Sequence, residues 1–224
     1  MTLPRIIPWR NQYIDALEKL PHYILRCDEK DLPNIPENEL LKAKIANYKK
    51  LSIEFGTGSG SHIVNRAQLE PETLFVGFEL RFKRAFAVAE KAQRELVNNL
   101  LICRTKSETA DQIFNKKSVD KFYMNFPDPW EKRKWHKNRM IQPETVLQWR
   151  ELLKDDGIFS FKTDHEDYFK HAVKTFSNNS YKIIKQTEDL YNSEYLTDNI
   201  PTEFERLFCS KGKKIFFLEA LKQQ

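Results

Sequence analysis

The sequence of 224 residues contains no uninterrupted apolar stretch near the ~18 residues that would suggest a membrane span. Its first twenty residues lack the compact apolar run and the small-residue cleavage pattern of a secretory signal. Cysteine is scarce, and Cys27, Cys103 and Cys209 are too far apart and odd in number for a disulfide framework or a zinc site with paired ligands. These absences predict a cytoplasmic protein with free thiols, no metal and no membrane partner.

The composition is that of a soluble globular protein, with 40% hydrophobic and 31% charged residues. A chain of this length forms one α/β domain and buries a substantial core without disulfides or metals. Lysine and arginine exceed aspartate and glutamate by 37 to 32, giving a formal net charge of +5. This excess is too small to indicate a nucleic-acid partner by itself, so the position of the charges matters more.

From residue 51 onward, short apolar segments alternate with longer segments of helical pattern. The candidate strands are LSIEF, LFVGFE, LLICR, VDKFYMNF, IFSFKTD and IFFLEA, and the candidate helices lie near 60–70, 81–98, 108–115, 142–154 and 165–177. This alternation predicts a doubly wound α/β fold, with a mostly parallel sheet covered by helices on both faces. The domain so defined covers 51–224.

Residues 1–50 do not follow this alternation. Prolines at positions 4, 8, 21, 33 and 36 limit helix length there, and two short helices are expected near 11–19 and 37–49. We expect an N-terminal extension that is packed on the main domain or tethered to it.

A glycine-rich segment, Gly56-Thr57-Gly58-Ser59-Gly60, follows the first strand directly and precedes a helical pattern. Glycines allow a sharp turn and close approach of the backbone to a ligand, and the helix start presents unpaired N–H groups. The segment predicts a nucleotide-like cofactor. Dinucleotide enzymes use a similar turn for a pyrophosphate, and a turn that serves only the fold is a third interpretation.

Two glutamates separate these interpretations. Glu79, at the end of the second strand, is placed to accept hydrogen bonds from both hydroxyls of an adenosine ribose, as dinucleotide enzymes also require. Glu54 stands two residues before the first glycine, where it would repel a pyrophosphate but suit the cationic methionine end of S-adenosylmethionine. The pair therefore favours a methyltransferase over a nicotinamide-dependent oxidoreductase.

The fourth strand ends in NFPDPW, residues 125–130, at the edge where open α/β folds bind ligands. Two prolines bracket Asp128 and restrict the directions in which its carboxylate points. The stretch 132–139, KRKWHKNR, follows with five lysines and arginines, two side chains that could stack on bases and no acid. Such a run is often only a solvated surface, but basic and aromatic groups beside a cofactor cleft also suit RNA phosphates and unpaired bases.

The sequence resembles the bacterial tRNA (guanine-N7-)-methyltransferases over about residues 51–220. The motifs that carry the resemblance are IEFGTGSG, VGFE, NFPDPW with a lysine four residues beyond its aspartate, the pair Thr163-Asp164, and a late TEFE at 202–205. The resemblance implies a Rossmann-like class I S-adenosylmethionine-dependent methyltransferase fold with an antiparallel last strand, IFFLEA. It implies 7-methylguanosine formation in tRNA, at guanine 46 of the variable loop.

The resemblance also assigns roles to residues. Those expected at the S-adenosylmethionine site are Glu54, Gly56, Gly58, Gly60, Glu79, Arg81, Lys106, Ser107 and Asp128, of which Asp128 also acts in catalysis. Those expected at the tRNA substrate are Lys132, Asp164, Thr202, Glu203, Phe204 and Glu205. We expect tRNA and not DNA as the partner, and the sequence leaves a monomer and a homodimer open.

One departure from the family concerns the adenine. Many members carry an acid after the third strand, where it accepts from the adenine amino group, but this chain has Lys106 there with Ser107 beside it. A lysine cannot accept that hydrogen bond. Ser107 or a backbone carbonyl takes the role, or the affinity for the cofactor is altered. The last case leaves open an RNA-binding protein that has lost its methyltransferase activity.

The expected chemistry requires alignment rather than proton removal, because N7 of guanine carries a free lone pair. Asp128 is expected to orient the guanine edge or the cofactor and to favour the transition state electrostatically. Asp164 and Thr202 have a second interpretation as helix caps, and Glu205 lies where it would complete a capping box with Thr202. The lysines at 211, 213 and 214 either contact phosphates or form a solvated turn.

Overall fold

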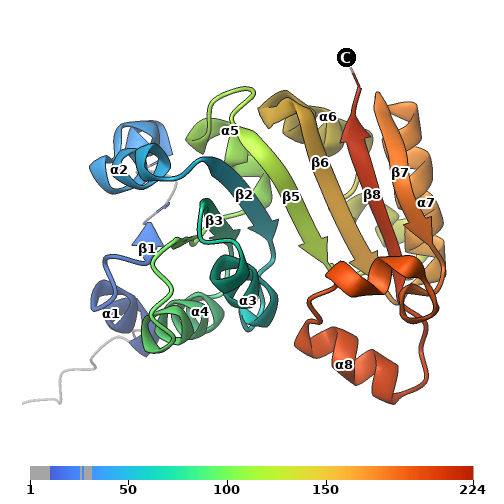
Figure 1. Cartoon of the computed structure of the whole chain (residues 1–224), viewed down its shortest axis with the longest axis horizontal. Coiled ribbons are helices and arrows are strands. Elements are labelled where there is room, and N and C mark those ends of the chain that lie inside the picture. The colour runs from blue at the N-terminus through green and yellow to red at the C-terminus, as the bar shows by residue number, and fades with distance from the viewer. Residues whose placement is uncertain (1–10, 26, 28–31, 224) are drawn as a thin grey trace, which may run out of the picture.

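The computed structural model describes residues 11–25, 27 and 32–223. Within them the strands form one sheet of order β1-β4-β3-β2-β5-β6-β8-β7 (Figure 1). The strands are β1 (Ile24–Leu25), β2 (Lys50–Phe55), β3 (Thr73–Phe78), β4 (Leu100–Cys103), β5 (Val119–Asn125), β6 (Leu153–Thr163), β7 (Tyr181–Thr187) and β8 (Phe216–Lys222). Every neighbouring pair is parallel except the two that β8 makes with β6 and β7.

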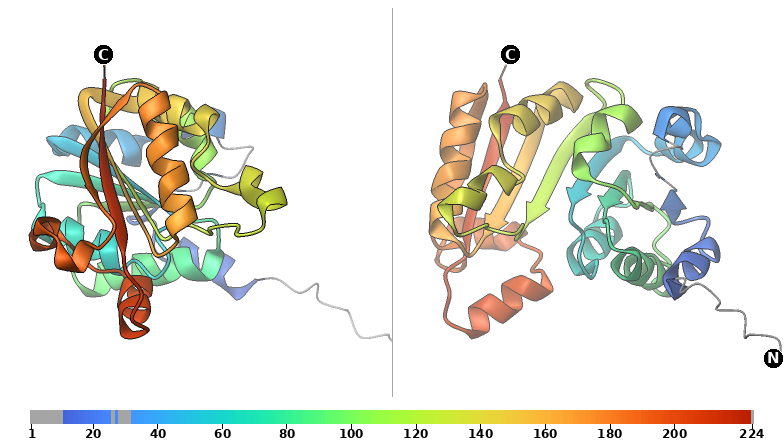
Figure 2. Two further views of the ribbon diagram at one scale, coloured as in Figure 1. Left: turned by 90° about the vertical axis from the view of Figure 1, so that its right-hand side faces the viewer. Right: turned by 180° about the vertical axis from the view of Figure 1, so that it is seen from behind.

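Helices cover both faces of this sheet (Figure 2). The α-helices are α1 (Gln12–Glu18), α2 (Glu39–Asn47), α3 (Ser61–Leu69), α4 (Phe82–Arg94), α5 (Ala110–Ile113), α6 (Pro143–Leu152), α7 (Glu166–Asn178) and α8 (Glu203–Ser210). The 3₁₀ helices are η1 (Leu32–Glu37), η2 (Ser107–Thr109), η3 (Arg133–Asn138), η4 (Leu190–Asn192) and η5 (Glu194–Asp198). Of three buried clusters among the described residues, one large core contains α1, α3 and α4, and the other large core contains α2, α5, α6 and α7. The third is small and consists of Leu190, Ile215 and Phe217.

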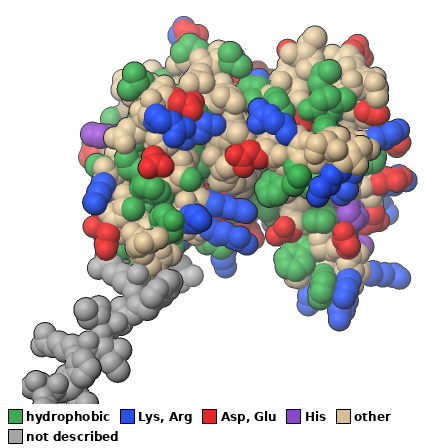
Figure 3. All heavy atoms as spheres, turned by 90° about the horizontal axis from the view of Figure 1, so that it is seen from below, with side chains coloured by type: hydrophobic (Ala, Val, Ile, Leu, Met, Phe, Trp, Pro, Cys, Tyr) green, Lys and Arg blue, Asp and Glu red, His purple; other side chains and the backbone are tan. Residues whose placement is uncertain are grey.

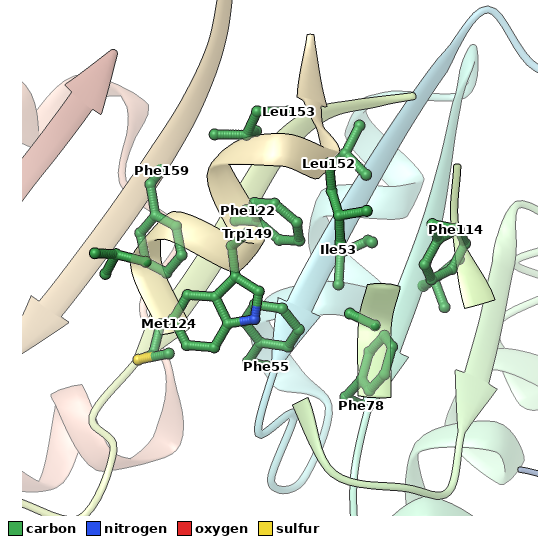
Figure 4. Close-up of a cluster of buried hydrophobic side chains, with 14 of the residues drawn as sticks. Ile53, Phe55, Phe78, Phe114, Phe122, Met124, Trp149, Leu152, Leu153 and Phe159 are labelled. Atoms are coloured by element: carbon green, nitrogen blue, oxygen red, sulfur yellow. The ribbon is translucent and has the colours of Figure 1, made fainter. Parts of the chain in front are cut away.

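The two cores follow from side-chain alternation along the strands. In β5, Phe122 and Met124 enter one core while Tyr123 enters the other, as the two-residue period of a strand requires. Figure 4 shows the core that contains Phe122 and Met124. There the ring centroids of Trp149, on α6, and Phe55 lie 4.7 Å apart. Burial of aromatic side chains of this size supplies much of the apolar area that stabilises such a domain.

The structure confirms the predicted fold: a mostly parallel sheet, helices on both faces and an antiparallel last strand. The strand β7 was not predicted, because its residues form no apolar run: after the buried Tyr181, exposed and half-buried side chains alternate. Among residues 1–50, the strand β1 joins the sheet, where it pairs with β4 through Leu25 and Cys103. Among the described residues, no helix is both long and apolar enough to cross a membrane.

The strand order reverses between β2 and β5. From β2 the chain runs to β3 and β4 on one side, and it later returns through β5 to β6 on the other. Loops leaving two such strands diverge and open a crevice at the carboxyl edge of the sheet. The glycine-rich segment follows β2 and the NFPDPW segment follows β5, so the fold brings the two predicted motifs together.

Candidate active site

A cleft of about 650 Å³ opens at this edge of the sheet, within the ~300–1,000 Å³ usual for small-molecule sites. It is lined by the loops that follow β2, β3, β4 and β5 and by the first turn of α8. Figure 3 looks onto this edge and shows a notch between two halves of the surface, with acidic and basic side chains on both sides.

The glycine-rich segment forms one wall of the cleft. Gly56, Gly58 and Gly60 have φ angles of 73°, 57° and 78°, a left-handed conformation that is strained for residues with a Cβ atom. A Cβ atom placed on Gly56 or Gly58 would meet nothing within 4 Å, so both face open space. The helix α3 begins after Gly60 without a side-chain cap, which leaves backbone N–H groups of its first turn for a ligand.

Glu79 is fixed against this loop. One carboxylate oxygen accepts from the backbone N–H of Gly58 at 3.1 Å and the other from that of Arg81 at 2.9 Å. A carboxylate offers about four acceptor positions, so two remain toward the cleft that Glu79 lines. The arrangement fits two ribose hydroxyls. The side chain of Arg81 is exposed at the same wall.

Glu54 lies deeper, at the end of β2, and is 2% exposed. Its Oε2 lies 2.8 Å from Nδ1 of His62, and its Oε1 accepts from the side-chain amide of Asn125 at 3.2 Å. Burial lowers the pKa of His62, which is 3% exposed, and thus favours its neutral form. His62 was not among the predicted site residues, because a histidine in a helical pattern carries no signal until its partner is known.

The loop after β4 presents a glutamate that was not among the predicted site residues either. Lys106 is exposed and Ser107 is buried, and both line the cleft together with Glu108. The hydroxyl of Ser107 donates to Glu108 at 3.1 Å, and the carbonyl of Lys106 accepts both the backbone N–H and the hydroxyl of Thr109. The carbonyl of Lys106 is therefore engaged, the hydroxyl of Ser107 is used as a donor, and an acid stands two positions beyond Lys106.

Asp128 is exposed in the cleft wall after β5. Within the described chain its carboxylate accepts no hydrogen bond and forms no ion pair. The residues on either side are strained, because Phe126 and Trp130 have φ angles of 52° and 47°, a conformation that costs about 1–3 kcal/mol per residue. Strain of this kind around an unpaired carboxylate is typical of a functional site.

The basic stretch 132–139 forms η3 and its flanks. It lies between Glu131 and Met140, which both line the cleft, and so forms the rim next to these two residues. Trp130 and Trp135 meet edge to face, with ring centroids 6.2 Å apart, and are 37% and 39% exposed. The ammonium groups of Lys132 and Lys134 lie 4.9 Å and 5.5 Å from the centroid of the Trp135 ring. Exposed rings flanked by lysines suit the stacking of bases beside their phosphates.

Arg139 departs from the rest of this stretch. It is 2% exposed and donates to the carbonyl of Pro129 at 2.8 Å and to Asp167 at 2.6 Å. The same hydrogen bond lowers the pKa of Asp167. The expectation that the whole stretch contacts phosphates is therefore wrong for Arg139, which ties the NFPDPW segment to α7.

Asp164 follows β6 and lines the cleft, where it forms an ion pair with Lys213. It does not cap α7, because the N-cap is His165, whose side chain accepts from the N–H of Tyr168. The capping interpretation of Asp164 is therefore wrong, and its carboxylate remains at the cleft. Lys213 joins it there rather than standing only in a solvated turn.

The TEFE segment begins α8. Thr202 and Glu205 form the capping box that was considered, with the N–H of Glu205 donating to the hydroxyl of Thr202 at 3.0 Å. Thr202, Glu203 and Phe204 line the cleft. Glu205 instead is fully buried and pairs with Lys162 at 2.6 Å. Its side chain therefore stabilises the packing of α8 and does not line the cleft.

Acidic side chains outnumber basic ones among the residues that line the cleft, which suits a cationic cofactor better than a pyrophosphate. The sheet, with its mostly parallel strands and antiparallel β8, has the fold of class I S-adenosylmethionine-dependent methyltransferases. The fold matches the 16S rRNA methyltransferase KamB with a TM-score of 0.65 at 14% identity, covering 84% of this chain and 94% of that one. An antibiotic-related methyltransferase matches with a TM-score of 0.63 at 18% identity, over 83% and 94% of the two chains.

The amino-acid sequence is similar to a more specific group of methyltransferases. Residues 48–218 match a family described as "Putative methyltransferase". The tRNA (guanine-N(7)-)-methyltransferases of Ureaplasma urealyticum and Clostridioides difficile are 36% and 33% identical, over 85% and 80% of this chain and 89% and 84% of theirs. A bifunctional glycosyltransferase/methyltransferase of Fusobacterium nucleatum is 35% identical over 95% of this chain, which spans 33% of that longer protein. The chain belongs to the tRNA (guanine-N7-)-methyltransferase family.

Proposed function

We propose that this protein transfers a methyl group from S-adenosylmethionine to N7 of guanine 46 in the variable loop of tRNA. The observation that carries the proposal is the meeting of two motifs in one cleft. The glycine loop with its two glutamates follows β2, and an unpaired aspartate with a basic, aromatic rim follows β5. Membership of the family supports the same reaction.

The residues of the cleft wall that follows β2 and β3 fit the cofactor. Glu79 keeps free acceptor positions for the ribose, and the backbone of Gly56 and Gly58 leaves space for the nucleoside beside it. Glu54 supplies a carboxylate for the cationic methionine end. When bound, S-adenosylmethionine supplies the electrophilic methyl group, and the acidic lining of the cleft favours the positive charge on its sulfur.

Glu108 is our candidate for the acid that is missing at Lys106. An adenine whose ribose is held by Glu79 extends toward the loop after β4, where Glu108 presents a carboxylate at the cleft. The hydrogen bond from Ser107 uses one acceptor position of this group, and the others remain for the adenine amino group. We propose that Glu108 takes the place of the acid that many family members carry at the position of Lys106.

Replacing Glu108 by alanine is expected to raise the dissociation constant for S-adenosylhomocysteine by about fivefold, because one partly solvated hydrogen bond contributes about 1 kcal/mol. Isothermal titration calorimetry measures the change. Glu90→Ala, an exposed glutamate of α4 away from the cleft, is the matched control and should bind as the wild type does. Equal affinity of the Glu108 variant and the wild type would remove Glu108 from the adenine site.

The cleft wall that follows β5 fits the guanine. Asp128 can accept from donor groups on the base edge, and N7 has a lone pair that needs no prior proton removal. The enzyme must then hold N7 in line with the methyl group. Positive charge moves onto the base in the transition state, and the nearby carboxylate of Asp128 stabilises it. Phe204 and Glu203 contribute to the same pocket from α8.

The rim fits the RNA backbone. Guanine 46 has to leave the tertiary contacts of a folded tRNA to reach the cleft. Lys132, Arg133 and Lys134 are exposed beside the two tryptophans, where they neutralise phosphates and set the register of the tRNA. Asp164 and Lys213 lie at the cleft on the side of α8.

Replacing Lys132 and Arg133 together by alanine is expected to weaken tRNA binding and to reduce its salt dependence. Loss of two phosphate contacts should lower the slope of log Kd against log salt concentration by about 1.5. Fluorescence anisotropy of labelled tRNA over a series of KCl concentrations measures the slope. Lys116→Ala with Lys117→Ala, which removes two exposed lysines at the start of β5, should leave it unchanged. A slope equal to that of the wild type would place the RNA surface elsewhere.

Two assays test the proposal against its alternatives. Thermal unfolding with S-adenosylhomocysteine or NAD should show stabilisation by the first compound, and stabilisation by NAD alone would indicate an oxidoreductase. Incubation with tRNA and labelled S-adenosylmethionine should then transfer label to the RNA. A protein that bound tRNA but transferred no methyl group would instead be an RNA-binding protein.

A further inference from the structure

Beside the cleft lies a buried histidine that no motif of the sequence explained. We propose that His62 is a positioning residue that fixes the carboxylate of Glu54 toward the aminoacyl end of the cofactor. The proposal rests on the proposed function, and it concerns the part of that site that recognises the amino acid rather than the nucleoside.

The carboxylate of Glu54 is held from two elements. His62, in the first turn of α3, lies 2.8 Å from Oε2, and Asn125, at the end of β5, donates to Oε1 at 3.2 Å. The side chains of His62 and Glu54 are 4% and 2% exposed. Each carboxylate oxygen therefore has one fixed partner, and the group cannot rotate without breaking a hydrogen bond between two nearly buried side chains.

The direction of the hydrogen bond follows from its partners. A carboxylate only accepts, so Nδ1 of His62 carries the proton and donates. The ring is held in this orientation by Tyr123, which it meets edge to face with centroids 5.0 Å apart. The donor is thus fixed by packing as well as by its acceptor.

A neutral donor has a particular advantage at this site. A lysine or arginine beside Glu54 would orient the carboxylate but would also cancel its charge. Lys162, the nearby buried cation, has its hydrogen bonds directed to Glu205, Asn199 and the carbonyl of Ile200. The neutral ring of His62 orients Glu54 and leaves its negative charge in the cleft for a cationic amino group.

Two substitutions separate the donor from the ring. His62→Phe keeps an aromatic ring of similar size but has no donor. His62→Asn loses the ring but places an amide nitrogen at the position of Nδ1. Two compounds separate the ends of the cofactor site: S-adenosylhomocysteine carries the amino acid, and 5′-methylthioadenosine contains the same nucleoside without it.

Calorimetric titration of both variants and the wild type with both compounds tests the assignment. His62→Phe should weaken binding of S-adenosylhomocysteine at least about tenfold, the effect of losing a hydrogen bond to a charged group. It should leave the dissociation constant for 5′-methylthioadenosine within about twofold of the wild type. His62→Asn should bind both compounds nearly as the wild type does.

Other results would overturn the assignment. Unchanged binding of S-adenosylhomocysteine by His62→Phe would show that the hydrogen bond does not matter, and equal weakening of both compounds would show a general structural role. Weakening by His62→Asn as large as that by His62→Phe would assign the effect to the ring. If the wild-type protein bound neither compound, the proposed function itself would fail, and this assignment with it.

Discussion

Replacing Asp128 by alanine is expected to lower kcat for methyl transfer by at least about a hundredfold, the usual effect of removing one group that stabilises transition-state charge. Asp128 is exposed and accepts no hydrogen bond within the described residues. Its loss should therefore change the free energy of unfolding by no more than about 0.5 kcal/mol. Single-turnover transfer of labelled methyl to tRNA measures the rate, and urea unfolding measures the stability.

Two further variants make this result specific. Asp128→Asn keeps an acceptor but removes the charge, so it should fall between the alanine variant and the wild type. Asp156→Ala, which removes an exposed aspartate within β6, should behave as the wild type in both assays. Near-normal turnover by Asp128→Ala would exclude the catalytic role of this residue.

Replacing Lys162 by methionine is expected to lower the free energy of unfolding by about 3–5 kcal/mol, the usual cost of leaving one partner of a buried ion pair without the other. Lys162 and Glu205 are 4% and 0% exposed, and Nζ lies 2.6 Å from Oε2. Burial lowers the pKa of Lys162, and the carboxylate of Glu205 acts in the opposite direction. Without the ammonium group, Glu205 would hold an uncompensated charge under α8.

A second substitution tests this explanation. Glu205→Gln removes the charge but keeps one oxygen, which can take the place of Oε1 and accept from the hydroxyl of Tyr191 and the side-chain amide of Asn199. Only the long hydrogen bond of 3.4 Å from the N–H of Thr202 to Oε2 would be lost. Added to Lys162→Met, Glu205→Gln should recover about 2 kcal/mol or more in urea unfolding. If the double variant were no more stable than Lys162→Met alone, the loss would come from packing around Lys162 and not from the unpaired charge.

The ion pair also explains how α8 reaches the cleft. Glu205 links β6 to the first turn of α8, the turn that carries Thr202, Glu203 and Phe204 into the cleft wall. Lys162→Met should therefore impair tRNA methylation through the position of α8 as well as through stability. The same buried pair accounts for the place of Glu205 in the TEFE motif without a contact to RNA.

The parts of this fold that the sequence predicts are those with local signals. The strand β2 with its glycine loop, the helix after it and the NFPDPW segment each depend on neighbouring residues, and the topology of an α/β sheet then places them at one edge. The short helix α8 has a capping box, a local signal that was recognised at Thr202. The edge strand β7 has no apolar run and was missed.

The parts that could not be predicted depend on pairs far apart in the chain. Arg139 is buried because Asp167 and the carbonyl of Pro129 satisfy it, and the sequence alone shows only one more arginine in a basic run. Glu205 belongs to a motif, but its distance from the cleft follows from Lys162, 43 positions earlier. The roles of Glu108 and His62 likewise depend on the tertiary structure, which places Glu108 at the cleft and His62 beside Glu54.

The most direct test of the central claim is mass mapping of a tRNA transcript after incubation with the purified protein and S-adenosylmethionine. We predict one added methyl group, recovered as 7-methylguanosine in the nuclease fragment that contains guanine 46. It should be absent from the reaction with Asp128→Ala and from a transcript with adenine at that position. A methyl group on another base or atom, or no methyl group from a protein that binds both S-adenosylmethionine and tRNA, would contradict the proposed function.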